Sequence, residues 1–405
     1  MVLDFRIAAV FKQHCYHRYT IRLMTGFPLQ TFLDTPTPFY YYDMELLAKT
    51  LDAIGSAAPE KEFCVHYAVK ANCNPAILKF IAGRGLGADC VSGGEIRAAL
   101  EAGFPAAKIV FAGVGKTDSE INFALDRGIG CFNVESIPEL EVINELASAR
   151  GLTANIALRV NPDIDAHTHH YITTGLEENK FGIALEMLDD AIAFCMRHAG
   201  LHLAGLHFHI GSQITINEPF VILCERVNSL IERYADQGID FKYINVGGGL
   251  GVDYDNPDAK PVPDFESYFG TFRKHLALRP GQSLHFELGR AVTAQCGSLI
   301  SRVLYVKEGV DRKFVIADAG MTDLIRPALY GAHHLVQNIT SKAESTEKYD
   351  VVGPICESSD CFGSGETLPE TRRGDLLAFR TAGAYGEVMA SRYNCRNLPG
   401  AVFGK

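Results

Sequence analysis

The chain has 405 residues, more than one ordinary domain, so two domains are expected. Its 47% hydrophobic and 21% charged residues are typical of a globular protein and exclude a disordered or fibrous one. A formal net charge of −10 argues against a broad nucleic-acid-binding surface.

The N-terminal segment differs from the rest of the chain. Residues 1–23 are mildly basic and aromatic, without the apolar core of a signal peptide or the serines of a transit peptide. We expect them to form an extension outside the main fold. Residues 24–45 contain the strand-like stretch TPFYYYD, which we expect to join a β-domain formed by the end of the chain.

Eight short apolar runs follow, rich in Val, Ile and Phe and apolar on both faces in places, as in buried parallel strands. Helical patterns that end on glycine lie between most of them, for example PAILKFIAGRG and TDSEINFALDRG. Eight strand–helix units predict a (β/α)8 TIM-like barrel over residues 46–290, with a doubly wound open sheet as the alternative. The runs are residues 63–69, 86–92, 108–113, 129–134, 155–160, 203–210, 242–247 and 283–288.

After about residue 290 the sequence has alternating strands and turns, as in GSLISRVLYVKEGVDRKFVIADAG and RRGDLLAFRTAGAYG. We therefore predict a mostly antiparallel C-terminal β-domain over residues 291–405. The eleven cysteines are scattered and form no CxxC pair, which favours reduced thiols in a cytoplasmic protein. No apolar run is long enough to span a bilayer, so no membrane partner is expected.

Polar residues stand where the predicted strands end, which is where barrels of this kind place their chemistry. A chance convergence of so many polar strand ends is improbable, so we expect one site at the barrel mouth. These residues are Lys70, Asp89, Arg159, Asn161, His207, His209, Glu287 and Arg290.

The glycine triplet Gly247–Gly249 follows the seventh predicted strand. It is not a dinucleotide-binding fingerprint, because the next residues, VDYDNPDAKPVPD, do not form a helix. Its backbone N–H groups suit a phosphate cradle, together with Ser212 and with Gly289-Arg290 after the eighth strand. A metal site at HTHH (167–170) or at His207 and His209 is a weaker alternative, because no carboxylates stand close by in the sequence.

A phosphate cradle beside a strand-end lysine indicates pyridoxal 5′-phosphate. Lys70 would bind the cofactor aldehyde, and Glu287 would face the ring nitrogen. His209 is placed to stack on the ring.

The motifs YAVKAN (67–72), HIGSQ (209–213), GGGLG (247–251), ELGR (287–290), CES (356–358) and AGAYG (382–386) resemble those of the alanine-racemase-like, fold type III, pyridoxal-phosphate decarboxylases. Within that family, DCVSGGE (89–95), FAGVGKTDSEI (111–121), GLEENKFGI (175–183) and DAGMTDLIRPALYGAHH (318–334) resemble the branch that acts on diaminopimelate. The resemblance runs from about residue 25 to the end. It implies decarboxylation of meso-2,6-diaminopimelate to L-lysine and CO2 by a cytoplasmic homodimer.

The resemblance also implies roles for individual residues. Lys70, His209, Glu287 and Cys356 would be catalytic, with Cys356 as the proton donor. Cys356 and Glu357 would reach the site from the partner subunit. Cofactor binding falls to Lys70, His209, Ser212, Gly248, Gly249, Glu287, Leu288, Gly289, Arg290 and Tyr385, and substrate binding to Arg290, Arg326, Tyr330, Glu357 and Tyr385. Asp89 and Arg159 would support the site.

Leu288 departs from the family pattern, which has proline there, and we expect little effect on the chemistry. A related decarboxylase acting on ornithine, arginine or carboxynorspermidine is the nearest alternative, and Arg326 and Tyr330 speak against it because they suit a distal carboxylate. A racemase is less favoured because its family prefers arginine where Glu287 stands. A non-catalytic relative is disfavoured because Lys70 and Cys356 are intact.

Overall fold

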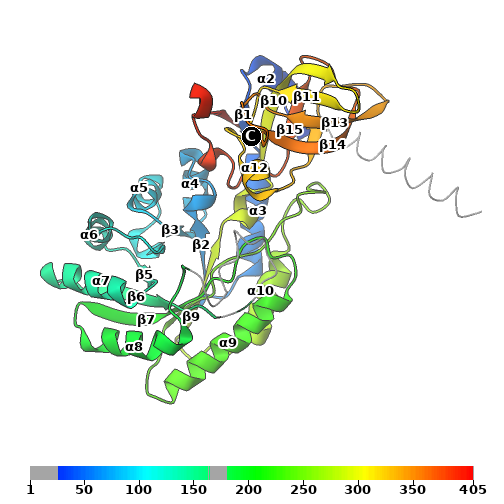
Figure 1. The fold of residues 1–405 in the computed structure, drawn as a ribbon. Helices are drawn as coiled ribbons and strands as arrows, with labels where there is room; N and C mark the ends of the chain where they lie inside the picture. Colours follow the sequence, from blue (N-terminus) through cyan, green and yellow to red (C-terminus); the bar gives the residue numbers. More distant parts are fainter. Residues whose placement is uncertain (1–25, 163, 165–179, 405) are drawn as a thin grey trace, which may run out of the picture.

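The computed structural model describes residues 26–162, 164 and 180–404. It has two parts: a barrel, lower in Figure 1, and a second sheet above it. The predicted extension at residues 1–23 and the HTHH stretch lie outside the described residues.

The first part is a closed barrel of eight parallel strands in chain order, from β2 to β9. Pairing of β2 with β9, in which His66 lies opposite Glu287, closes it. The eight predicted strands and the TIM-like barrel are thus confirmed, and the open sheet is excluded. The strands are β2 Phe63–Ala68, β3 Gly87–Cys90, β4 Ile109–Phe111, β5 Cys131–Val134, β6 Ala154–Arg159, β7 Leu201–His207, β8 Tyr243–Asn245 and β9 Ser283–Leu288.

Helices cover the outside of the barrel, and sequence signals fix their ends. Thr117 caps α6 in a reciprocal capping box with Glu120, and Gly128 ends that helix with left-handed backbone. Helix α3 packs against α10. The helices are α3 Met44–Ala57, α4 Pro75–Ala82, α5 Gly93–Ala102, α6 Asp118–Arg127, α7 Ile137–Ala149, α8 Leu188–Arg197, α9 Glu218–Ala235, α10 Phe265–His275 and α11 Arg290–Thr293, with single 3-10 turns η2 Val69–Ala71, η3 Ala106–Lys108 and η4 Leu185–Met187.

The second part is a mostly antiparallel sheet in the order β12-β15-β10-β11-β13-β14. Strand β1, from the beginning of the chain, lies between β10 and β16, antiparallel to the first and parallel to the second. The strands are β1 Phe39–Tyr42, β10 Gly297–Glu308, β11 Lys313–Ala317, β12 Val336–Asn338, β13 Thr346–Val352, β14 Cys361–Pro369, β15 Leu376–Phe379 and β16 Gly400–Phe403; the short helices are α2 Leu29–Asp34, α12 Arg326–Tyr330, η5 Glu387–Met389 and η6 Tyr393–Cys395.

Hydrogen bonds fasten the second part to the end of β2. Asn72 donates to the Tyr42 hydroxyl (2.8 Å) and to the Gly383 carbonyl (2.9 Å). The backbone N–H of Tyr385 donates to the Ala71 carbonyl at 2.8 Å. Because Asn72 is buried, these bonds hold the sheet beside the C-terminal mouth of the barrel.

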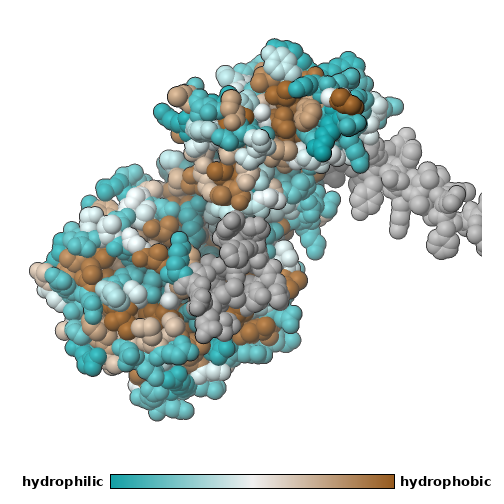
Figure 2. Space-filling model, viewed as in Figure 1, coloured by the Kyte–Doolittle hydropathy of each residue, from teal (hydrophilic) through white to brown (hydrophobic). Residues whose placement is uncertain are grey.

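The face seen in Figure 2 is largely hydrophilic, with hydrophobic residues in scattered patches. Within the described ranges, no helix is both long and apolar enough to cross a membrane.

Candidate active site

A cavity of about 1100 Å³ opens at the C-terminal ends of the barrel strands. Arg326, Tyr330 and Tyr385 reach it from the second part of the molecule. The structure therefore brings most of the predicted site residues to one place. Those that line the cavity are Lys70, Asp89, Arg159, His207, His209, Ser212, Gly249, Glu287, Leu288, Gly289, Arg290, Arg326, Tyr330 and Tyr385; Gly248 and Asn161 were also predicted for the site but are not among its lining residues.

The sequence pattern placed Lys70 at the end of the first barrel strand. In the structure Lys70 lies one step later, in the 3-10 turn η2 directly after β2. Its Nζ is 3.5 Å from Oδ2 of the buried Asp89 in β3, and neither Asp89 oxygen accepts a hydrogen bond from a described residue. Burial disfavours the ammonium, but the charges of Asp89 and Glu287 outweigh it and raise the pKa of Lys70. Burial and the Glu287 charge raise the pKa of Asp89. The amine thus faces one carboxylate that has no other partner.

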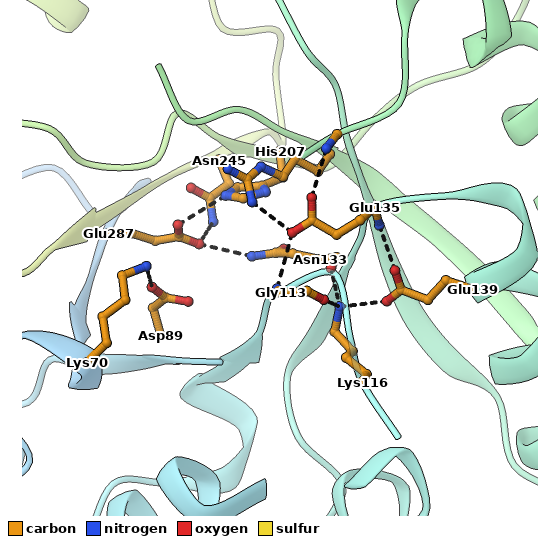
Figure 3. Close-up of polar contacts among 12 residues, drawn as sticks. Lys70, Asp89, Gly113, Lys116, Asn133, Glu135, Glu139, His207, Asn245 and Glu287 are labelled. Atoms are coloured by element: carbon orange, nitrogen blue, oxygen red, sulfur yellow. Dashed lines mark hydrogen bonds and ion pairs between the residues drawn. The ribbon is translucent and has the colours of Figure 1, made fainter. Parts of the chain in front are cut away.

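Glu287, near the end of β9, is held by three side chains from β5, β7 and β8 (Figure 3). Oε1 accepts from Asn133 (2.9 Å) and Asn245 (2.7 Å), and Oε2 accepts from Nε2 of His207 (3.0 Å). Burial would raise the pKa of Glu287, but His207 and the charge of Lys70 outweigh it and lower the pKa. The carboxylate is therefore fixed in position and ionised.

His209 lies two residues beyond the end of β7 and accepts a hydrogen bond on Nδ1 from the Gly248 N–H (3.3 Å). Burial, together with the charges of Arg159 and Lys70, lowers the pKa of His209 well below its usual value. The ring is therefore neutral with its proton on Nε2. Gly248 cannot be replaced, because a Cβ there would lie 1.9 Å from the Glu287 carbonyl oxygen. The glycine turn lets backbone approach the cavity closely.

Two buried arginines form the other side of the cavity. Arg290, at the start of α11, donates from Nε and Nη2 to the Ser212 hydroxyl (3.2 and 3.0 Å). Arg326, at the start of α12, donates from Nη1 to Nε2 of His334 (3.0 Å). Both guanidinium groups also donate to the hydroxyl of Tyr254. Neither has a carboxylate partner among residues 26–162, 164 and 180–404.

A second polar network supports the mouth from β4, β5 and β6 (Figure 3). Arg159 pairs with Glu135 at 2.7 Å, and the backbone N–H of Glu135 donates to Glu139 at 2.9 Å. Glu139 in turn pairs with Lys116 at 2.6 Å, although the side chain of Lys116 is only 1% exposed. These contacts fix Arg159 where it lines the cavity.

Cys356 and Glu357 are not brought to this cavity within one chain. Both are exposed in the loop between β13 and β14. The Cys356 N–H donates to the Asn394 side chain at 3.3 Å, and Glu357 accepts from the Tyr393 hydroxyl at 2.6 Å.

Sequence reasoning missed several residues at the site, among them Asn133, Asn245 and Tyr254. The two asparagines are polar positions inside the apolar runs GCFNV and YINV, so the rule that found the other strand ends also applies to them. Tyr254 lies in a loop without regular structure, and nothing in its spacing marks it. Within the described part of the chain, no group of three or more His, Cys, Asp or Glu is placed to hold a metal ion.

Comparisons with known proteins agree with this geometry. Residues 46–294 match the family model for the pyridoxal-binding domain of pyridoxal-dependent decarboxylases. The chain is 61% identical over 374 residues to the diaminopimelate decarboxylase of Bacteroides thetaiotaomicron, covering 92% of this chain and 97% of that protein. It is 44% identical over 366 residues to the Neisseria meningitidis serogroup A enzyme, covering 90% and 89%. The solved structure of Helicobacter pylori diaminopimelate decarboxylase with L-lysine superposes with a TM-score of 0.88 at 40% identity, covering 93% of each chain.

Proposed function

The chain belongs to the diaminopimelate decarboxylase family of pyridoxal-dependent decarboxylases, and on that premise we propose that it converts meso-2,6-diaminopimelate to L-lysine and CO2. The observation that carries the substrate assignment is the pair of buried guanidinium groups, Arg290 and Arg326, with no carboxylate partner among the described residues. Unpaired buried charges are costly, so the pair suits an anion delivered by the substrate. The distal carboxylate of diaminopimelate, which survives the reaction, is such an anion.

The cavity fits pyridoxal phosphate. Lys70 and Asp89 face each other on one wall, Glu287 is held as an anion at the barrel end, and the turn at Gly248 leaves no room for a side chain. Ser212 accepts from Arg290 and keeps its own proton to donate, which suits a phosphate oxygen. Bound there, the cofactor supplies an aromatic electron acceptor for the pair of electrons left when CO2 departs.

Lys70 contributes the amine. Its ammonium must lose a proton before it can act as a nucleophile, and Oδ2 of Asp89 is 3.5 Å away. We assign Asp89 the role of accepting that proton.

Glu287 and His209 contribute fixed electrostatics. The three donors around Glu287 maintain its negative charge in a buried place, which is what a protonated ring nitrogen needs as a partner. His209 is neutral and lines the cavity beside Gly248, so it adds a flat apolar face without a competing charge.

We propose that the enzyme is a homodimer with shared sites. Cys356 and Glu357 lie outside the cavity and are exposed, which supports their delivery to the cavity of a second copy. In that arrangement the Cys356 thiol donates the proton to the α-carbon after CO2 leaves, and Glu357 pairs with the distal ammonium of the substrate.

The remaining assignments are also proposals. We take residues 46–290 as the cofactor-binding domain and 291–405 with 24–45 as the β-domain, supported by the pairing of β1 with β10. We place the enzyme in the cytoplasm; the ten cysteines within the described ranges are free thiols, which supports a reducing compartment.

The test is CO2 release from a panel of meso-diaminopimelate, ornithine, arginine and carboxynorspermidine. We expect turnover of diaminopimelate alone, with ornithine slower by roughly 10³-fold or more because it leaves buried arginines unpaired. Comparable rates on ornithine and diaminopimelate would refute the substrate assignment.

A further inference from the structure

Tyr254 connects the two parts of the molecule at the cavity wall. It lies in the loop after β8, where Asp253 accepts the backbone N–H groups of Asp255 (2.9 Å) and Asn256 (2.8 Å). The Tyr254 carbonyl accepts from the N–H of Leu335 (3.3 Å). The rings of Tyr254 and His334 pack in a T-shaped arrangement with their centroids 5.1 Å apart. The barrel loop is thereby fixed against the β-domain.

The Tyr254 hydroxyl lies between the two arginines. It accepts from Nη1 of Arg290 at 2.6 Å and from Nη1 of Arg326 at 2.8 Å. Its ring also faces both cations, with the guanidinium carbons 5.9 and 4.8 Å from the ring centroid. One phenol therefore holds together an arginine from the barrel and an arginine from the β-domain.

The Tyr254 hydroxyl still has its proton to donate. A tyrosine hydroxyl has two acceptor lone pairs and one proton. The two arginines occupy both lone pairs, and no described residue accepts the proton. Burial and the charge of Arg290 lower the pKa of Arg326. The proton of Tyr254 and the free N–H groups of two guanidinium groups thus all await an acceptor.

We propose that Tyr254 is a substrate-binding residue, whose hydroxyl donates to the carboxylate held by Arg290 and Arg326. The inference rests on the proposed function, because the carboxylate is the distal one that diaminopimelate and L-lysine share. A hydroxyl that accepts from two cations is a stronger donor than an isolated phenol, since chained hydrogen bonds polarise one another. Tyr254 would also favour substrates with a distal carboxylate, because a bound diamine would leave the proton of the Tyr254 hydroxyl without an acceptor.

The experiment compares the holoenzyme with Tyr254→Phe, which removes only the oxygen. The matched control is Tyr268→Phe, because the Tyr268 hydroxyl is buried, has no partner among the described residues and lies outside the cavity. We would measure kcat and KM on meso-diaminopimelate, the dissociation constants of L-lysine and cadaverine by calorimetry, and the visible absorption of the bound cofactor.

In Tyr254→Phe we expect KM and the L-lysine dissociation constant to rise about 10- to 100-fold, the loss of one hydrogen bond to a charged group. We expect kcat within about threefold of wild type, since the distal contact is the same in ground and transition states. Cadaverine binding and the absorption band should not change, and Tyr268→Phe should match wild type throughout.

Unchanged KM and L-lysine affinity in Tyr254→Phe, with wild type turning over diaminopimelate, would overturn the role of Tyr254 and leave the proposed function intact. If wild type fails on diaminopimelate but Tyr254→Phe still weakens L-lysine binding, the proposed function falls and the carboxylate-binding role stands. Equal weakening of L-lysine and cadaverine would overturn the role, because cadaverine has no carboxylate.

Discussion

The barrel mouth and the loop between β13 and β14 both carry predicted catalytic residues, but they hold them in opposite ways. Glu287 is buried and accepts from three side chains within 3.0 Å. Cys356 is exposed, and its N–H donates to one side chain at 3.3 Å. The loop is nevertheless well anchored, because the buried Asp360 accepts from the backbone N–H groups of Ile355 and Met321, each at 2.6 Å.

The barrel mouth is held together by contacts within one chain, whereas the β13–β14 loop exposes its predicted catalytic residues to solvent. The side chains that hold Glu287 all come from barrel strands of the same chain. The loop is fixed at its base and turns Cys356 and Glu357 outward. Three experiments test this contrast on turnover, from the largest expected effect to the smallest, and a fourth concerns the stability of the barrel.

Lys70→Ala removes the amine at the barrel mouth. We expect loss of turnover and of the visible band of the bound cofactor, because no other described lysine lies near Asp89. Lys49→Ala is the matched control, since Lys49 is exposed and pairs with Glu45 on the surface of α3. Purified Lys70→Ala protein that keeps the visible band would show that the amine comes from elsewhere.

Cys356→Ala removes the proposed proton donor in the β13–β14 loop. We expect kcat to fall about 10²- to 10⁴-fold, the usual contribution of a positioned acid, with an unchanged visible band. Mixing this variant with Lys70→Ala should restore roughly a quarter of wild-type activity, because half of randomly formed dimers contain one intact site. No recovery on mixing, with dimers verified by mass, would contradict the shared site.

Asn245→Ala and Asn394→Ala compare the two halves with the same substitution. Asn245 donates to Glu287 at 2.7 Å, so its loss should lower kcat about tenfold and shift the pH dependence of the visible band. Asn394 accepts the exposed Cys356 N–H, so its loss should cost about 0.5 kcal/mol and change kcat by less than about threefold. A larger loss of kcat in Asn394→Ala than in Asn245→Ala would mean that activity depends more on the position of the loop than on the support of Glu287.

His285 concerns the barrel interior alone, and its expected effect is on stability and not on turnover. It donates from Nδ1 to Nε2 of His66 at 2.9 Å, and burial lowers the pKa of His285 to about 2. Below about pH 6.5 the unfolded chain binds a proton there that the folded chain does not, so stability falls as pH falls. From pH 6.5 to 5 this amounts to about 2 kcal/mol.

Urea unfolding of wild type and His285→Asn at pH 7.5, 6.0 and 5.0 measures that contribution as the difference between the two slopes. The variant should lose stability less steeply between pH 6.5 and 5. Parallel slopes would show that His285 is not the group responsible.

Much of the barrel was predictable because its strands are largely buried apolar runs and several have polar residues at or near their C-terminal ends. Leu203 and Phe286 belong to patterns that the local sequence displays directly. The support of Glu287 was not predictable, since Asn133 lies 154 positions away in sequence and meets it only through barrel closure. The strands β12, β13, β14 and β16 lie in a region where short polar-rich runs give weak periodicity.

Tyr254 could not be predicted for a similar reason. Its role depends on Arg290 and Arg326, which come from two parts of the molecule and meet only after these have docked. Cys356 was predicted from its motif alone. A single chain gives it no contact with the cavity, so neither spacing nor periodicity links it to Lys70.

The position of β1 has a consequence for synthesis on the ribosome. Its partners β10 and β16 both follow the entire barrel in sequence, so Phe39–Tyr42 leaves the ribosome before either exists. At ordinary translation rates the intervening barrel takes on the order of tens of seconds to make. Throughout that interval a strand of four aromatic residues has no native sheet to join, which makes it a natural ligand for a chaperone.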